Sequence, residues 1–201
     1  MDDDTIVARY IHDLCSDMRR YAESDLCKAY RALEHRVRST QDQQDQLELE
    51  RLYVALTNLA DGGDHQMLYE RVLQAARKHG YTLTPGPKPR QLALIDTAHP
   101  DEEPFMLAAD SPLDVQAADI MHGLASTEMA HRPISYGPYR PQAVRTIVAE
   151  AVTYCVLRAL GADYPACVPA LVLAEVPPDV VEEWSGVVAD LYARLMQDRQ
   201  A

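Results

Sequence analysis

Two apolar helical stretches of this sequence carry polar side chains that could do chemistry together. The first, DIMHGLASTEMAH at 119–131, holds His122 and His131. The second, RTIVAEAVTYCVLRALG at 145–161, holds Glu150 among apolar neighbours. A carboxylate in such a stretch is costly to bury without a partner, so Glu150 needs a metal ion, an Arg, a His or backbone donors. A helical metal site is therefore the first chemistry to consider.

A helical zinc-hydrolase site has a defined set of groups. Two His four residues apart on one helix hold Zn²⁺, and a Glu directly after the first His takes a proton from the metal-bound water. A carboxylate from a following helix completes the ligands. The order of elements fits this plan, because a strand ribbon, a helix, a loop and the helix with Glu150 follow one another. No register of 119–131, however, contains a complete HExxH motif.

The elements that must position these groups are mainly helical. Hydrophobic periodicity and breakers predict helices over 5–37, 43–60, 65–79, 111–131, 141–160 and 177–197. QLALID at 91–96 and FMLA at 105–108 are expected to pair as a small antiparallel ribbon. TPGPKPR at 84–90 contains three prolines and is neither helix nor central strand. It divides a helical N-terminal region, 1–84, from a C-terminal domain, 91–201, and the predicted fold class is mainly α (α+β).

Two helices carry specific local signals. In the first predicted helix the apolar residues recur at three- and four-residue steps, as a buried stripe requires; they are Val7, Ile11, Leu14, Met18 and Tyr21, followed after a shift by Leu26, Tyr30, Leu33 and Val37. SPLD at 111–114 favours a helix start with Ser111 as N-cap and Pro112 at the first helical position.

Composition and charge exclude several classes of function. The formal net charge is −12; residues 1–90 contribute −2 (13 bases against 15 acids) and residues 91–201 contribute −10 (6 against 16). An acidic half repels phosphate, so no direct nucleic-acid binding by this half is expected. The four cysteines form no CxxC pair, and neither a signal peptide nor a membrane-spanning run is recognised. The expected compartment is the cytoplasm, with reduced thiols.

Residues 91–196 resemble a known group of peptidase domains. The segment AEAVTYCVLRALGAD at 149–163 is similar to the third-ligand helix of ImmA/IrrE-type zinc peptidases and of ArdC-like antirestriction proteins. The following YPACVPAL at 164–171 and VVEEWSGVVADLYARL at 180–195 resemble the ending of these domains. The resemblance implies a zincin-like helical domain with a small β ribbon, and zinc as the metal that such a site would take.

The resemblance also assigns positions, and several depart from the motif. IMHGLAS at 120–126 stands where the family has LLHELAH, which places His122 at the first ligand position and Glu150 at the third. Gly123 replaces the catalytic Glu and Ser126 replaces the second His. His122 and Glu150, with His131 as an additional group, are therefore the candidate metal ligands. Because protein zinc sites need three or four ligands, no catalytic residue and no cofactor are expected.

Two other registers keep part of the motif. TEMAH at 127–131 retains a Glu and the second His, as Glu128 and His131, but Arg132 and Pro133 follow directly and should end the helix. ADIMH at 118–122 retains only the second His and puts Asp119 in the place of the base. Neither register supplies both zinc-binding histidines.

Three functions remain open from the sequence. The first is a catalytically inactive, peptidase-like protein that binds a regulator or a defence protein, as the resemblance to mobile-element and counter-defence proteins implies. The second is an active zinc peptidase with non-standard ligands that cleaves a repressor. The third is an acidic inhibitor that mimics nucleic acid. The N-terminal helices would form a homodimer, bind the partner or pack on the domain, and no membrane association is expected.

Overall fold

The computed structural model describes residues 3–57, 65–131, 140–162 and 167–196, and these residues are mostly helical. The fold class predicted from the sequence is confirmed, since the described chain combines helices with one small antiparallel sheet. In chain order the elements are α1 (Asp3–Glu23), α2 (Asp25–Thr40), α3 (Gln43–Thr57), α4 (His65–Lys78), β1 (Tyr81–Pro85), β2 (Gln91–Asp96), β3 (Phe105–Ala108), α5 (Leu113–Ala130), α6 (Pro141–Ala159), α7 (Cys167–Leu173), α8 (Pro178–Glu183) and α9 (Ser185–Met196).

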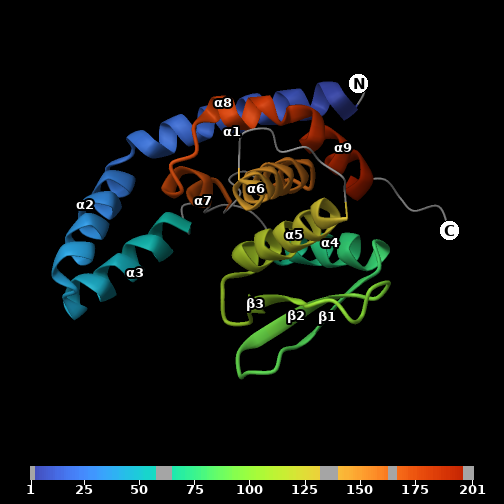
Figure 1. Cartoon of the computed structure of the whole chain (residues 1–201), viewed down its shortest axis with the longest axis horizontal. Coiled ribbons are helices and arrows are strands. Elements are labelled where there is room, and N and C mark those ends of the chain that lie inside the picture. Colours follow the sequence, from blue (N-terminus) through green and yellow to red (C-terminus); the bar gives the residue numbers. More distant parts are fainter. Residues whose placement is uncertain (1–2, 58–64, 132–139, 163–166, 197–201) are drawn as a thin grey trace.

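Helix α6 is the centre of the fold. It packs against α1, α5, α7, α8 and α9, and its residues from Val148 to Leu157 are almost all buried. Figure 1 shows α1 and α8 on one side of α6, and α5, α4 and the sheet on the other. A helix enclosed in this way must be apolar around its circumference, which explains the long apolar run of its sequence. Any polar residue of α6 that faces the interior therefore needs a partner from a neighbouring helix.

The sheet has three strands in the order β1-β2-β3, all antiparallel. The expected ribbon of QLALID and FMLA is confirmed as β2 and β3, with Leu94 opposite Phe105. Strand β1 is an addition to the prediction, which places the proline-rich segment 84–90 outside helices and central strands; β1 is an edge strand and ends at Pro85. Pro85 is tolerated because it ends an edge strand, where a missing backbone donor costs little.

The first predicted helix is wrong in one respect: residues 5–37 form two helices that meet at Ser24. Ser24 has an extended backbone (φ −64°, ψ 145°), and its hydroxyl accepts a hydrogen bond from the Cys27 backbone N–H. An N-cap therefore starts α2 at the point where the apolar stripe shifts. The stripe itself is confirmed, because Val7, Ile11, Leu14, Met18 and Tyr21 are all buried.

Two further expectations about helix ends are corrected. The final helix is broken at Trp184, whose backbone (φ −97°, ψ 10°) separates α8 from α9. Pro112, and not Ser111, is the N-cap of α5, and no side chain caps that end. Gln116 instead donates from its side-chain amide to the carbonyls of Ala109 and Ser111, which secures the chain entering α5.

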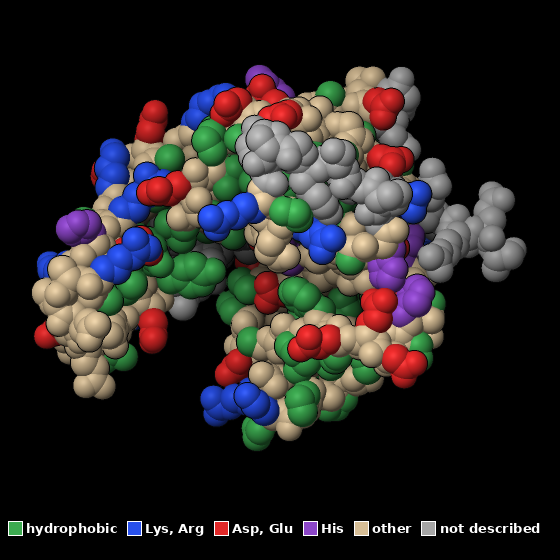
Figure 2. Space-filling view, in the orientation of Figure 1, with side chains coloured by type: hydrophobic (Ala, Val, Ile, Leu, Met, Phe, Trp, Pro, Cys, Tyr) green, Lys and Arg blue, Asp and Glu red, His purple; other side chains and the backbone are tan. Residues whose placement is uncertain are grey.

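The N-terminal helices pack on the C-terminal part of the chain. Helix α1 contacts α6, α7, α8 and α9, while α4 contacts α5 and β1. Helices α2 and α3 form an arm, held by a bidentate pair of Arg36 with Asp45 at 2.7 and 2.8 Å. Figure 2 shows a hollow between this arm and the sheet.

No helix in the described ranges is long and apolar enough to span a membrane.

We expect Ser24→Ala to lower the free energy of unfolding by about 1 kcal/mol, because the N-cap hydroxyl is lost from α2. Ser16→Ala is the matched control, since Ser16 is exposed inside α1 and alanine is the better helix former there. Urea denaturation followed by circular dichroism measures both. Equal stability of the two variants would contradict a capping role for Ser24.

Candidate functional site

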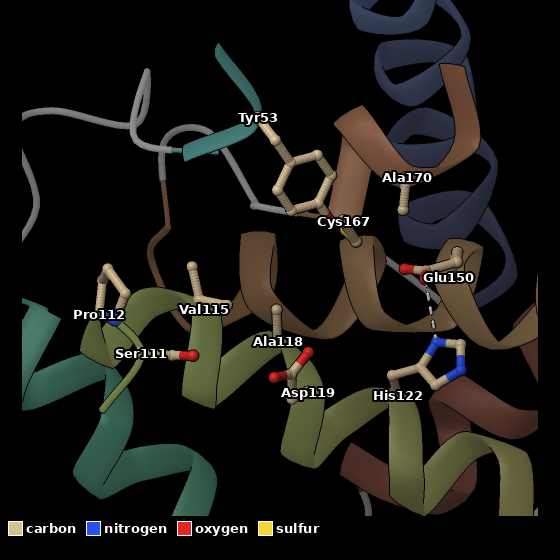
Figure 3. Close-up of a pocket in the computed structure, with 10 residues that line it drawn as sticks. All are labelled: Tyr53, Ser111, Pro112, Val115, Ala118, Asp119, His122, Glu150, Cys167 and Ala170. Atoms are coloured by element: carbon tan, nitrogen blue, oxygen red, sulfur yellow. Dashed lines mark ion pairs between the residues drawn. The ribbon is translucent and has the colours of Figure 1, made fainter. Parts of the chain in front are cut away.

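A cavity of about 240 Å³ lies where α3, α5, α6 and α7 meet. Figure 3 shows the side chains of Asp119 and His122 rising from α5 toward Glu150 of α6. Ser111, Pro112, Val115 and Ala118 form its wall on the α5 side, Cys167 and Ala170 line it from α7, and Tyr53 reaches over it from α3. Most of the wall is therefore apolar, and the charged groups are concentrated at one end.

The structure brings together His122 and Glu150, which the family resemblance places at the first and third ligand positions. His122 Nδ1 lies 3.2 Å from Glu150 Oε1, and both side chains are largely buried, at 21% and 14% exposed. The direction of this contact falls outside hydrogen-bond geometry, so His122 Nδ1 is a buried atom without a well-formed hydrogen bond. Charge attraction is the main link between the two groups, and it supplies the partner that a buried Glu150 requires.

The protonation of His122 follows from this contact. Burial by itself lowers the pKa of His122, but the contact with Glu150 and the charges of Glu150 and Asp119 outweigh burial, so the pKa is raised. The imidazolium form is consequently favoured beside the carboxylate. A protonated imidazole has no lone pair to give to a metal ion, so proton and metal compete for His122.

Asp119 completes the charged end of the cavity. Burial raises the pKa of Asp119 to about 6; the charge of Glu150 adds to this effect, and His122 opposes it. Two carboxylates thus share one imidazole, which leaves excess negative charge in the cavity when both are ionised. The same charges, after burial, raise the pKa of Tyr53 above its usual value.

Gly123, the residue that the family resemblance aligns with a catalytic Glu, is covered by the sheet. A Cβ atom added at Gly123 would lie 2.8 Å from Phe105 Cδ1 and 3.2 Å from Leu94 Cδ2. The Phe105 ring also contacts the His122 ring, with centroids 5.9 Å apart. Since a Cβ essentially never approaches so closely, a side chain at 123 would require the Phe105 ring to move. Ser126, which the resemblance aligns with the second histidine, lies one turn after His122 and offers only a hydroxyl.

The residues of the alternative register lie elsewhere. Glu128 faces α9, where Arg194 Nη1 lies 3.9 Å from its carboxylate. His131 is the C-cap of α5. It follows His122 by nine residues, which places it about 13 Å further along the helix and on the opposite face. There it contacts Glu102 and stacks on His99, with ring centroids 4.8 Å apart. His131 therefore does not join His122 and Glu150.

Three residues that line the cavity were not expected near Glu150 from the sequence: Asp119, Tyr53 and Cys167. Asp119 precedes His122 by three residues, a helical spacing that places both on one face, and this was the local signal for it. Tyr53 comes from a distant helix, and no local pattern connects it with α5. Cys167 is fully buried, and burial followed by the charge of Glu150 raises its pKa well above the usual value. Its thiol stays protonated at neutral pH and is no nucleophile.

Comparisons of the chain with protein-family models, with curated proteins and with solved structures find no match.

We expect Gly123→Ala to lower the free energy of unfolding by about 1 kcal/mol, because overpacking against Phe105 exceeds the gain in helix propensity. Gly186→Ala is the matched control, since a Cβ at this helical glycine meets nothing within 4 Å. That variant should be more stable by up to about 1 kcal/mol. Chemical denaturation measures both, and an equal gain at the two positions would show that Phe105 does not fill the space at Gly123.

We expect Asp119→Asn to stabilise the fold at neutral pH. A folded-state pKa of about 6, above the ordinary value of 3.8, means that the folded chain binds the proton more tightly than the unfolded chain. The free energy of unfolding of the wild type therefore falls as pH rises from about 4 to 6. The variant lacks the carboxyl group, so this decrease does not occur in it. At pH 7.5 the variant should gain about 1–2 kcal/mol, less than the full shift because solvent at the cavity mouth screens the charge.

Urea denaturation between pH 4 and pH 7.5 measures this gain. Asp101→Asn is the control, since Asp101 is exposed in the turn after β2. A gain for Asp119→Asn that is the same at both pH values, or is matched by the control, would contradict the raised pKa.

Proposed function

We infer that this chain is a protein-binding module built on the plan of a zinc peptidase and without peptidase chemistry. The order of a strand ribbon, α5 and α6, and the contact of His122 with Glu150, support the plan. The proposal that peptidase chemistry is absent rests on one observation, the packing of Phe105 over Gly123. Gly123 supplies no carboxylate to act on a metal-bound water, and Phe105 fills the space that such a side chain would need.

The cavity residues do not fit a catalytic zinc ion. In the described part of the chain, one group of three side chains has its ligand atoms within 4.8 Å of one another. It consists of Asp96, His99 and His131 and lies outside the cavity. Within the cavity, His122 and Glu150 neutralise each other, and Ser126 is a poor substitute for a second histidine.

The chemistry of the cavity favours a cationic side chain of a partner. Asp119 and Glu150 face one histidine, so an incoming Lys or Arg would neutralise the excess carboxylate and favour the ionised form of Asp119. The apolar wall suits the aliphatic stem of such a side chain. The −10 charge of residues 91–201 attracts a basic partner over a longer range. A regulator or a defence protein with an exposed basic segment is the partner class that we propose.

A peptide library tests this proposal. Fluorescent unstructured peptides with a central Lys, Arg, Glu or Leu are titrated with the purified, untagged chain and followed by anisotropy. We expect the Lys or Arg peptides to bind most tightly and Asp119→Asn to weaken their binding by at least about tenfold, the effect of losing roughly 1.4 kcal/mol. Asp101→Asn should bind as the wild type does.

The same peptides, incubated with the protein and Zn²⁺, are examined for cleavage by mass spectrometry. Intact peptides are expected after prolonged incubation. Cleavage at a defined bond that stops on addition of a chelator and in Glu150→Gln would overturn the proposal in favour of a peptidase with non-standard ligands. Binding without preference for Lys or Arg would overturn the assigned partner chemistry.

A further inference from the structure

A second group of ligand-type side chains lies on the surface, where the turn between β2 and β3 meets the C-terminal end of α5. Asp96 ends β2, His99 and Glu102 lie in the turn, and His131 caps α5. Each of Asp96, His99 and His131 places a ligand atom within 4.8 Å of the other two. Figure 2 shows histidines gathered with acidic side chains beside the sheet.

The contacts within this group have the form of a metal site. His99 Nδ1 lies 2.9 Å from Asp96 Oδ2, and His131 Nε2 lies 3.5 Å from Glu102 Oε2. The two imidazole rings stack, with an interplanar angle of 28°. Each ring therefore has one nitrogen directed at a carboxylate oxygen. An ion placed between that nitrogen and that oxygen would replace the contact and be bound by both groups.

We propose that Asp96, His99 and His131, with Glu102 as a fourth group, bind a divalent transition-metal ion of the zinc class. Two imidazoles and two carboxylates suit Zn²⁺, which accepts four nitrogen and oxygen ligands in a tetrahedron. Mg²⁺ and Ca²⁺ favour oxygen ligands alone, so the two histidines select against them.

Closure of this site needs only small movements. Ligands at about 2.0–2.2 Å from a tetrahedral ion lie about 3.4 Å from one another, somewhat closer than the present limit of 4.8 Å. The side chains of His99 and His131 are 51% and 36% exposed, so their rotamers can adjust without disturbing the core. The two histidines are already neighbours, with ring centroids 4.8 Å apart.

The bound ion would fasten the sheet to α5. His99 and Glu102 precede β3, which begins at Phe105, while His131 closes the helix that contains Gly123. An ion shared between the turn and the helix end fixes the position of β3 over α5, and with it the Phe105 ring over Gly123. This role is separate from the partner binding proposed for the cavity, since none of the four ligand residues lines the cavity.

Calorimetric titration of the chelator-treated, untagged full chain with Zn²⁺ tests the proposal. We expect one ion per chain and a loss of affinity of at least about tenfold in His99→Ala and in His131→Ala, the size reached even by outer-sphere groups. His35→Ala is the matched control, because His35 is an exposed histidine on α2 far from the turn in sequence. It should bind Zn²⁺ as tightly as the wild type.

Two further measurements make the outcome decisive. Melting of the metal-free variants should match that of the wild type, and Zn²⁺ should raise the melting temperature of the wild type and not of His99→Ala. Co²⁺ bound in place of Zn²⁺ should give the visible absorption of a tetrahedral site. Absence of binding, binding that survives in the His99→Ala/His131→Ala double variant, or binding lost only in His122→Ala would each overturn the proposal.

Discussion

A buried carboxylate on the central helix is the constraint on which the arrangement of this fold depends. Glu150 belongs to α6, which other helices enclose on nearly every side. A charge in such a place destabilises the fold when it has no partner. His122 of α5 supplies the opposing charge at 3.2 Å. The register of α5 on α6 is tied to this pair, because a shift of one helical residue would separate the two groups.

The sheet packs against α5 on the side away from α6, and Phe105 of β3 contacts His122 there. Phe105 of β3 lies against both Gly123 and His122 and fills the space beside Gly123. Glycine at 123 is required for this close approach of sheet to helix. The contact of Phe105 with Gly123 therefore packs α5 against the sheet, and the cavity beside α5 presents the carboxylates of Asp119 and Glu150.

The sequence predicts the parts of this structure that depend on local periodicity. The helical stripe from Val7 to Tyr21, both ribbon strands and the helix with Glu150 follow from patterns within each segment. The break at Ser24 was missed because a single capping hydroxyl decides it, and the helical rhythm on both sides conceals it. The approach of His99 to His131, 32 residues later, was missed because only tertiary packing brings the turn to the helix end. Asp119 shared a helix face with His122, but its proximity to Glu150 depends on how α5 lies on α6.

The most direct test of this account is the titration of His122 itself. Imidazole nitrogen shifts of ¹⁵N-histidine-labelled, chelator-treated protein give its pKa, with His122→Ala used for assignment. The pairing with Glu150 predicts a pKa above the ordinary value of 6.5 in the wild type. In Glu150→Gln the pKa should fall below that of the wild type, because burial then acts with only Asp119 left to oppose it. A His122 pKa that is the same in both proteins would contradict the claim that these two residues neutralise each other in the centre of the fold.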